Sequence, residues 1–126
     1  MMNLYSLILI DDAYIDIFSP ESHPVVVRFS ERFTEGSRVS SLPALVVQPV
    51  KQVISDTGKY VTVEFADGRI VRNSRSGLYS AVASSVSDIK SFYSAYLDRK
   101  AKSITGKNRQ AVLAWLDISL STEGIE

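Results

Sequence analysis

Cysteine is absent from this chain of 126 residues. Its absence excludes a disulfide framework and any site that depends on a thiolate, but it does not decide the compartment. Histidine is almost as scarce, because His23 is the only one and stands before Pro24 in an expected turn. A catalytic base needs an acid or a nucleophile held beside it. The pattern supplies no such partner, so we expect His23 to be structural.

Long apolar runs are also missing. No stretch reaches the roughly 18 apolar residues that span a bilayer, and two aspartates end the apolar run of residues 4–10. That run is too short for a secretory signal, and no basic segment stands before it. We therefore expect a strand at residues 4–10 and no membrane partner.

Signatures of catalysis and of cofactor binding are lacking. Gly106-Lys107 is followed by asparagine, and no glycine stands upstream at the spacing of a phosphate-binding loop. The nucleophile elbow Gly-x-Ser-x-Gly does not occur. Asp11, Asp12 and Asp16 are the only close acids, and the glycine and distal glutamate of a calcium loop are missing. We expect no enzyme activity, no cofactor and no metal.

What the chain does have is the composition of a globular protein. Its length suits a single domain over residues 1–126, and a chain of this size buries roughly two-thirds of its unfolded surface. Hydrophobic residues make up 45% and charged residues 22%, which is ordinary for a protein with a core. A stable core is therefore expected without disulfides or metals.

The net charge is zero, but the charges are unevenly distributed. Residues 1–58 carry four bases against seven acids, and residues 59–126 carry ten bases against seven acids. The excess is sharpest between Arg69 and Arg109, where nine bases meet two acids. A polyanion is therefore a candidate partner. The alternative is a solvated helix face, since several of these bases stand near the expected end of a helix.

Alternation of apolar and polar residues predicts a series of antiparallel strands. The clearest is residues 59–65, which ends at an Asp67-Gly68 signal for a tight turn. Pro43 and Pro49 interrupt another segment and favour an edge strand or a bend there. The expected strands are 4–10 and 14–18, which form an N-terminal hairpin, then 24–33, 42–55, 59–65, 69–73 and 78–84, the last of which could instead be a short helix.

The apolar period changes from two to 3.6 after the strands and predicts two helices, at about 87–105 and 109–120. Ser85 or Ser87 can cap the first helix, Gly106 is expected to end it, and Asn108 is expected to cap the second. The predicted fold class is α+β, with an antiparallel meander sheet followed by two C-terminal helices.

The first helix carries a single stripe of large apolar side chains, about half of them aromatic. The stripe comprises Ile89, Phe92, Tyr93, Tyr96, Leu97, Ala101 and Ile104. The second helix is apolar on nearly every side, with more apolar surface than one small sheet covers. The helices could fold onto their own sheet or cross to that of a second copy. The surplus favours an obligate, interlocked dimer that buries more than ~2,000 Å².

The order of these elements resembles that of the coat proteins of single-stranded RNA bacteriophages, the leviviruses. Strands precede two C-terminal helices over nearly the whole chain. Residues 55–65 (SDTGKYVTVEF) are similar to a turn and strand in some members. Residues 84–104 (SSVSDIKSFYSAYLDRKAKSI) are similar to the passage from the last strand to the first helix.

The resemblance implies a structural capsid subunit that forms interlocked homodimers and assembles into an icosahedral shell. It implies a place in the virion, and in the host cytoplasm during assembly. In such a subunit the helices reach the sheet of the second copy, while the exposed sheet face binds hairpins of genomic RNA and could repress translation. The corresponding dimer interface would comprise Phe92, Tyr93, Tyr96, Leu97, Trp115 and Leu116.

The polar side of the predicted strands is the candidate RNA surface. Basic side chains would bind phosphates, and tyrosines would stack on bases. The candidates are Lys51, Tyr60, Thr62, Arg72 and Tyr79, with Glu64 on the same side opposing an anion. The alternative function is a small non-enzymatic interaction or regulatory module of phage or bacterial origin, with a barrel-like sheet and a helical hairpin. An undetected enzyme ranks far behind both.

Overall fold

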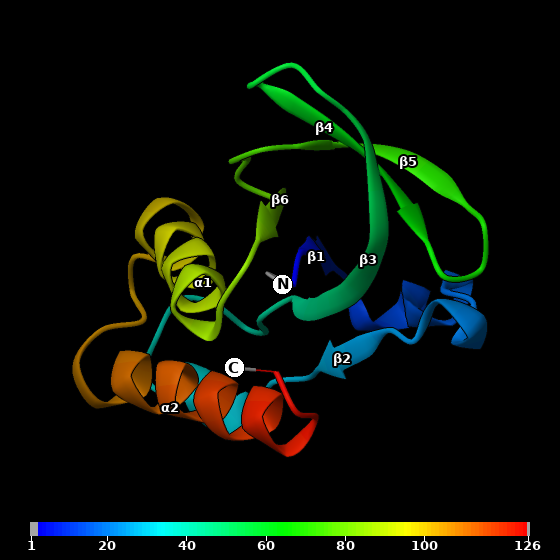
Figure 1. Cartoon of the computed structure of the whole chain (residues 1–126). Coiled ribbons are helices and arrows are strands. Elements are labelled where there is room, and N and C mark those ends of the chain that lie inside the picture. The colour runs from blue at the N-terminus through cyan, green and yellow to red at the C-terminus, as the bar shows by residue number, and fades with distance from the viewer. Residues whose placement is uncertain (1–2, 126) are drawn as a thin grey trace.

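The computed structural model describes residues 3–125, and these form a curled antiparallel sheet followed by two helices (Figure 1). The strands are β1 (Tyr5–Ile10), β2 (Val25–Val27), β3 (Ala44–Asp56), β4 (Tyr60–Phe65), β5 (Ile70–Ser74) and β6 (Ser80–Ala83). They lie in the order β5-β4-β3-β1-β6, and β2 pairs with β3 beside this path. The predicted α+β architecture is confirmed, and the last expected segment is a strand.

The sheet curls because β3 is long enough to pair with three other strands. Its first half pairs with β1 on one side and β2 on the other, whereas its second half pairs with β4. β4 continues to β5, and a bridge between Ser76 and Ala81 brings the segment after β5 to β6. Because β6 also pairs with β1, the strands form a closed succession of neighbours with a concave inside and a convex outside.

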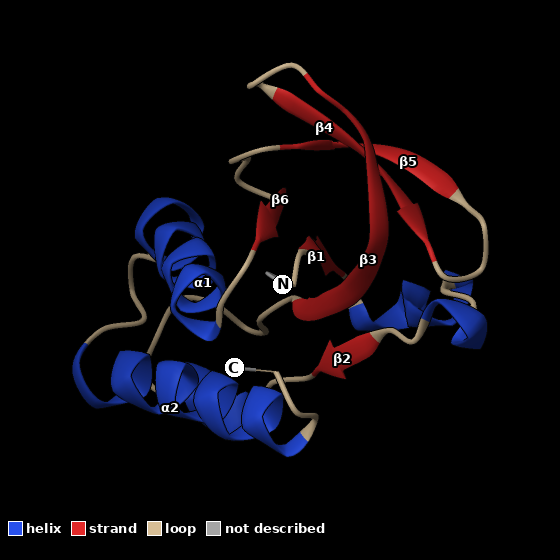
Figure 2. Ribbon diagram, viewed as in Figure 1, coloured by secondary structure: helices blue, strands red, loops and turns tan. Residues whose placement is uncertain are grey.

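The helices α1 (Val86–Lys100) and α2 (Gly106–Thr122) lie together on one side of the curled sheet (Figure 2). Ser85 begins α1, since its hydroxyl accepts the backbone N–H of Asp88 at 3.1 Å. Of the two predicted caps for this helix, Ser85 is therefore confirmed.

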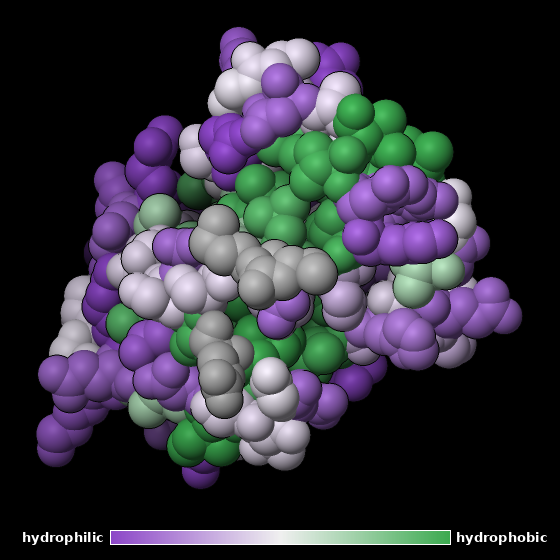
Figure 3. Space-filling view, viewed as in Figure 1, coloured by the Kyte–Doolittle hydropathy of each residue, from purple (hydrophilic) through white to green (hydrophobic). Residues whose placement is uncertain are grey.

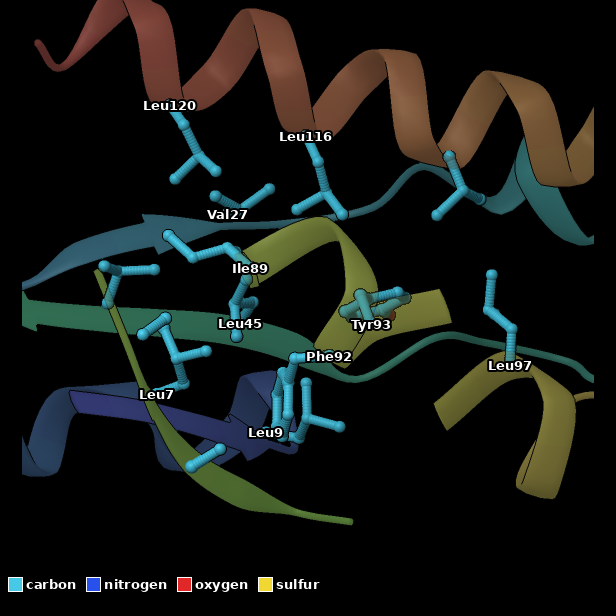
Figure 4. Packing of buried hydrophobic residues seen from close by; sticks show 14 of the residues in the cluster. Leu7, Leu9, Val27, Leu45, Ile89, Phe92, Tyr93, Leu97, Leu116 and Leu120 are labelled. Atoms are coloured by element: carbon cyan, nitrogen blue, oxygen red, sulfur yellow. The ribbon is translucent and has the colours of Figure 1, made fainter. Parts of the chain in front are cut away.

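The larger hydrophobic cluster lies between the helices and the strands that they cover (Figure 4). Leu7 of β1 and Leu45 of β3 point into it, and Ile89, Tyr93 and Leu97 enter it from α1; all five are fully buried. The stripe of α1 is thus covered by the chain's own sheet and by α2. A partner's sheet is not required to cover it.

A second, smaller cluster fills the concave inside of the sheet. Its fully buried members are Val61, Val63 and Phe65 of β4. The residues that alternate with them, Tyr60, Thr62 and Glu64, are only half-buried, which follows the predicted alternation along this strand. The polar side of β4 therefore forms part of the convex outside.

The expected N-terminal hairpin is wrong. The segment after β1 forms a 3₁₀ helix, η1 (Asp12–Ile17), instead of a second strand. Asp11 caps η1, because its carboxylate accepts the backbone N–H of Ala13 at 2.9 Å. Aspartate side chains that bind nearby backbone compete with strand pairing in this way. The neighbours of β1 are instead β3 and β6, which lie far along the chain.

The strand expected at 24–33 is also shorter than predicted. β2 ends at Val27, and a 3₁₀ helix, η3 (Glu31–Thr34), follows. Ser30 caps η3 by accepting the backbone N–H of Arg32 at 3.3 Å. Here again a short polar side chain ends the extended pairing by satisfying the local backbone.

Pro49 lies within the central strand, where we expected an edge or a bend. The backbone N–H of Val50 donates to Leu4 on the β1 side at 2.9 Å, so the nitrogen of Pro49 points to the other side. There β2 begins its pairing opposite Val47, and β4 begins opposite Val50. Proline is tolerated because its missing N–H falls in the gap between these two neighbours.

The predicted boundary between the helices is misplaced. α1 ends at Lys100, and Gly106, with φ at +55°, is the first residue of α2. Asn108 lies inside α2 and does not cap it; its side-chain amide donates to the carbonyl of Glu35 at 2.8 Å. The asparagine thus ties the helix to the loop after η3, a contact that local sequence does not indicate.

α2 buries one stripe instead of its whole circumference. Val112, Leu116 and Leu120 recur every four residues and are fully buried, whereas Trp115 and Ile118 remain partly exposed. The surplus apolar surface that favoured a dimer is therefore smaller than the composition of α2 implied.

The residues assigned to a dimer interface lie mostly inside the single chain. Phe92, Tyr93, Leu97 and Leu116 are buried in the larger cluster, and Tyr96 packs half-buried against it. Trp115 retains exposed surface, but its indole N–H donates to the carbonyl of Arg28 at 2.8 Å. In this arrangement, only Tyr96 and Trp115 of the six keep surface that a second copy could contact.

The buried phenol of Tyr93 makes stability sensitive to alkali. Its hydroxyl donates to the carbonyl of Pro43 at 2.9 Å, and burial, reinforced by the nearby Tyr96, raises its pKa well above the ordinary value. A raised pKa leaves stability unchanged below about pH 10, the value for an unfolded tyrosine, and lowers it above that pH. We expect the free energy of unfolding to fall by up to about 1.4 kcal/mol per pH unit for this group.

Urea denaturation between pH 8 and 11.5 measures this effect. Tyr93→Phe should give a shallower decline above pH 10 than the unmodified protein, although it is less stable at pH 8 because the bond to Pro43 is lost. Tyr14→Phe, at an exposed tyrosine of η1, should follow the unmodified protein. Identical alkaline slopes for all three proteins would contradict the assignment.

Candidate nucleic-acid interface

The convex face of β4 and β5 carries an aromatic side chain stacked with a guanidinium group. Tyr60 begins β4 and Arg72 lies on β5, where it pairs directly with Thr62. The guanidinium carbon of Arg72 lies 3.9 Å from the centre of the Tyr60 ring. This is the geometry of a cation–π contact, and it holds a flat, charged surface on the strand face. Three of the five predicted RNA residues are thus brought together.

Further bases surround Tyr60. The ammonium nitrogen of Lys59 lies 5.8 Å from the centre of the same ring, and Arg75 lies beyond the end of β5. Arg75 donates from Nε to the carbonyl of Gly58 at 3.0 Å and forms an ion pair with Asp56. The Arg75 guanidinium and the Gly58 N–H hold the pKa of the Asp56 carboxyl below its ordinary value. This ion pair fixes the turn between β3 and β4. Lys59 takes part in none of the ion pairs among the described residues.

Lys51 lies near the opposite end of β4 from Tyr60. β3 contains two bulges, because Val50 and Gln52 face consecutive residues of β4 and Val53 and Ser55 do the same. Lys51 is therefore the extra residue of the first bulge, and it is exposed. Its position makes it an outlying member of the candidate surface, separated along the strand from Tyr60.

The same half of β3 presents an open strand edge. β1 pairs no further along β3 than Pro49, and within the described residues no strand pairs with the β1 side of β3 after that point. Bulges and lysines are common devices that keep such edges from pairing with other chains. The two bulges and Lys51 thus protect the edge, which argues against dimer formation through it.

Apolar and acidic side chains border the basic residues. Val53 and Ile54 of β3 and Ile70 of β5 are about half exposed, and Figure 3 shows apolar surface over this part of the molecule. Glu64 also faces outward, but it accepts a hydrogen bond from the side-chain amide of Gln52. The face therefore mixes cations with aromatic and apolar surface, and one acid remains on it.

Tyr79 does not join this cluster. It precedes β6, and its ring lies 6.2 Å from that of Tyr96 on α1 in an edge-to-face arrangement. Burial and the nearby Tyr79 raise the pKa of Tyr96. Tyr79 is half exposed, so a base could reach it, but it belongs to the junction between sheet and helix and not to the Tyr60 face.

Several other charged side chains of the described residues are held in ion pairs. Asp12 pairs with Arg28 at 2.7 Å, and within residues 3–125 no group of three His, Cys, Asp or Glu side chains could hold a metal ion. In the groove between the helices, Lys90 pairs with Asp117 at 2.8 Å and Arg109 with Asp98 at 2.9 Å. These pairs join α1 to α2, and half-exposed pairs of this kind contribute little stability.

His23 is exposed in a turn with φ at +54°. None of the described helices is both long enough and apolar enough to cross a membrane. Comparison of the chain with protein-family models, with curated proteins and with solved structures finds no match. The function therefore has to be argued from the geometry of the site alone.

Sequence reasoning missed two groups of residues. Lys59 was counted in the basic excess but not assigned to the site, although its neighbour Tyr60 was. The polar residues Ser6, Gln48 and Asn73 are buried inside the sheet and were assigned no role. The signal in the sequence was a polar residue at a strand position where the alternation predicts a buried side chain.

Proposed function

We propose that the chain is a non-enzymatic binding module that holds single-stranded RNA against the convex face of β3, β4 and β5. The observation that carries the proposal is the Tyr60 ring with the Arg72 guanidinium at 3.9 Å and the Lys59 ammonium at 5.8 Å. Bases stack on tyrosine rings and on guanidinium planes, and neighbouring cations bind the phosphates that link those bases.

The balance of charges points to a single strand or a hairpin loop instead of a long duplex. Among the described residues of this face, Lys51, Lys59 and Arg72 take part in none of the ion pairs, so few phosphates can be neutralised. Binding through so few cations needs stacking to supplement it, and stacking requires bases that are not enclosed in a duplex.

A more specific version of this proposal is that the chain is a levivirus coat protein. It would then form homodimers, assemble into a shell, and occur in the virion and in the host cytoplasm. The burial of the α1 stripe in the chain's own core means that such a dimer would form through other surfaces, such as those of Tyr96 and Trp115. Electron microscopy of purified protein separates the two forms: closed particles tens of nanometres across support the coat subunit, and small uniform species support the interaction module.

The salt dependence of RNA binding tests the proposed face. The double substitution Lys51→Ala, Arg72→Ala removes two cations that would bind phosphates. Because a contact to a single strand contributes roughly 0.7 to the slope of log affinity against log salt, we expect the slope to fall by about 1.4. Filter binding of short RNA hairpins with long loops, between 25 and 200 mM salt, measures this.

Tyr60→Ala should give a different signature in the same assay. Stacking is worth roughly 1–3 kcal/mol per base and releases few ions, so affinity should fall about fivefold or more with an unchanged slope. Arg99→Ala, Lys100→Ala is the matched control, since these exposed bases end α1 away from the proposed face. An unmodified protein without RNA affinity at 25 mM salt, or a control that loses as much as the test variants, would overturn the proposal.

A further inference from the structure

A cavity opens inside the curled sheet. It has a volume of about 280 Å³ and lies between β1, β3, β5 and the end of η1. Its apolar walls include Ile8 of β1, Phe65 of β4, Val71 of β5, and Phe18, which follows η1. Sites for drug-sized ligands usually occupy roughly 300–1,000 Å³. A space slightly below that range suits one flat ring system.

Three buried polar side chains line this cavity beside its apolar walls. Ser6, Gln48 and Asn73 are only 6%, 3% and 7% exposed. The amide nitrogen of Asn73 donates to the Ser6 hydroxyl at 2.6 Å and to the Ala81 carbonyl at 3.1 Å. The amide nitrogen of Gln48 donates to the Ser22 hydroxyl at 3.0 Å. Both nitrogens are thus held by the protein, which fixes the orientation of the two carboxamides.

The side-chain oxygen atoms of Gln48 and Asn73 are the groups that could bind a ligand. In the part of the chain that the structure describes, neither the Gln48 nor the Asn73 side-chain oxygen receives a hydrogen bond. No buried side-chain polar atom there lacks a partner, and both residues line the cavity, so we take the two oxygens to be accessible from it. A ligand that fills the cavity must then bring hydrogen-bond donors for these two acceptors.

The cavity and the face proposed for RNA lie on opposite sides of β5, because Val71 and Asn73 face inward and Arg72 faces outward. Arg72 borders the cavity through its place in β5, but its guanidinium lies over the Tyr60 ring on the convex face. Arg69 lies at the same border, with its guanidinium carbon 5.5 Å from the centre of the Phe65 ring. A ring inside the cavity would therefore have the Arg69 guanidinium at its border, where it could pair with an attached phosphate.

We propose that this cavity binds one nucleobase that carries an exocyclic amino group. A single amino nitrogen supplies two hydrogens, which match the carboxamide oxygens of Gln48 and Asn73, while the apolar walls cover the ring. The base can belong to a free nucleotide or to a bound RNA strand; only the second source rests on the proposed function. Uracil lacks an amino group, and the two carbonyl oxygens that flank its N3–H would face the carboxamide oxygens, so we expect it not to bind.

Nuclear magnetic resonance tests the assignment on the unmodified protein. The side-chain amide signals of Gln48 and Asn73 are observed while AMP, CMP, GMP or UMP is added, and then while a short RNA of each composition is added. We expect AMP, CMP or GMP, alone or within RNA, to shift both signals, and UMP to leave them in place. Ribose phosphate without a base is the blank.

A pair of matched substitutions measures the contribution of the carboxamide. Gln48→Met keeps the length of the side chain and removes its oxygen, whereas Gln110→Met makes the same change at an exposed position of α2. Since one hydrogen bond is worth about 0.5–1.5 kcal/mol, Gln48→Met should weaken nucleotide binding roughly threefold to tenfold. Gln110→Met should leave it unchanged.

The outcomes separate the cavity from the RNA face. Shifts with free nucleotides support the cavity even if no RNA binds, and shifts only with RNA support a base that enters from the strand. RNA binding that depends on Tyr60 but leaves both amide signals in place overturns the cavity and leaves the proposed function standing. Equal shifts with UMP and AMP overturn the requirement for an amino group, and equal effects of the two glutamine substitutions overturn the role of Gln48.

Discussion

Leu97→Asp should abolish soluble folded protein. Leu97 is fully buried in the larger cluster, between the sheet and α2. Removing a buried leucine side chain costs about 2–5 kcal/mol, and a carboxylate without a partner in that place adds a further penalty. The sum approaches the entire stability of a typical domain, about 5–15 kcal/mol. Soluble yield and the helical circular dichroism signal measure the loss.

The control for this change must lie on the exposed side of the same helix. Lys90 is unsuitable because it pairs with Asp117 at 2.8 Å, so an aspartate there would meet a like charge. Ser91 is exposed and lies between buried residues of the stripe, and Ser91→Asp should leave stability within about 0.5 kcal/mol. Equal tolerance of Leu97→Asp and Ser91→Asp would show that α1 does not bury its aromatic stripe.

Asn73→Ala should loosen the closure of the sheet. The side-chain amide of Asn73 joins β5 to Ser6 of β1 and to Ala81 of β6 from inside the sheet. The substitution removes two hydrogen bonds and leaves a small void, so we expect a loss of about 2–4 kcal/mol. Urea denaturation measures the total loss of stability. Hydrogen exchange shows where the loss occurs: the N–H of Val82, which donates to the carbonyl of Arg75, should exchange faster.

Ser74→Ala is the matched comparison, since Ser74 adjoins Asn73 on β5 but is only half-buried. It should change stability by less than about 1 kcal/mol. If Asn73→Ala destabilised no more than Ser74→Ala, the buried amide would not be what holds β5 against β1 and β6.

Features that depend on local period were predictable. The residues of β4 alternate between the concave inside and the convex face as expected, because successive side chains of a strand point to opposite sides. Ser85 begins α1 because a serine hydroxyl satisfies the first free N–H groups of a helix. Tyr60, Thr62 and Arg72 were expected on one face, and they lie together there.

Errors arose where a short polar side chain had a partner that the local pattern does not show. The aspartate pair after β1 looked like a hairpin turn, but Asp11 caps η1 instead. Asn108 looked like a helix cap, but its amide reaches Glu35, 73 positions away. In each case the polar group could satisfy one of several backbone sites, and three-dimensional proximity selects among them.

The sequence by itself determined that this chain has an α+β fold, which faces of β4 and α1 are apolar, and that its bases gather after residue 59. Only the tertiary structure decided that the helices cover their own sheet, that β5 turns round to β6, and that Ser6 and Asn73 meet across 67 positions to line a cavity. The reason is physical: periodicity reports which side of an element avoids water, whereas the choice of neighbour depends on contacts between segments far apart in the chain.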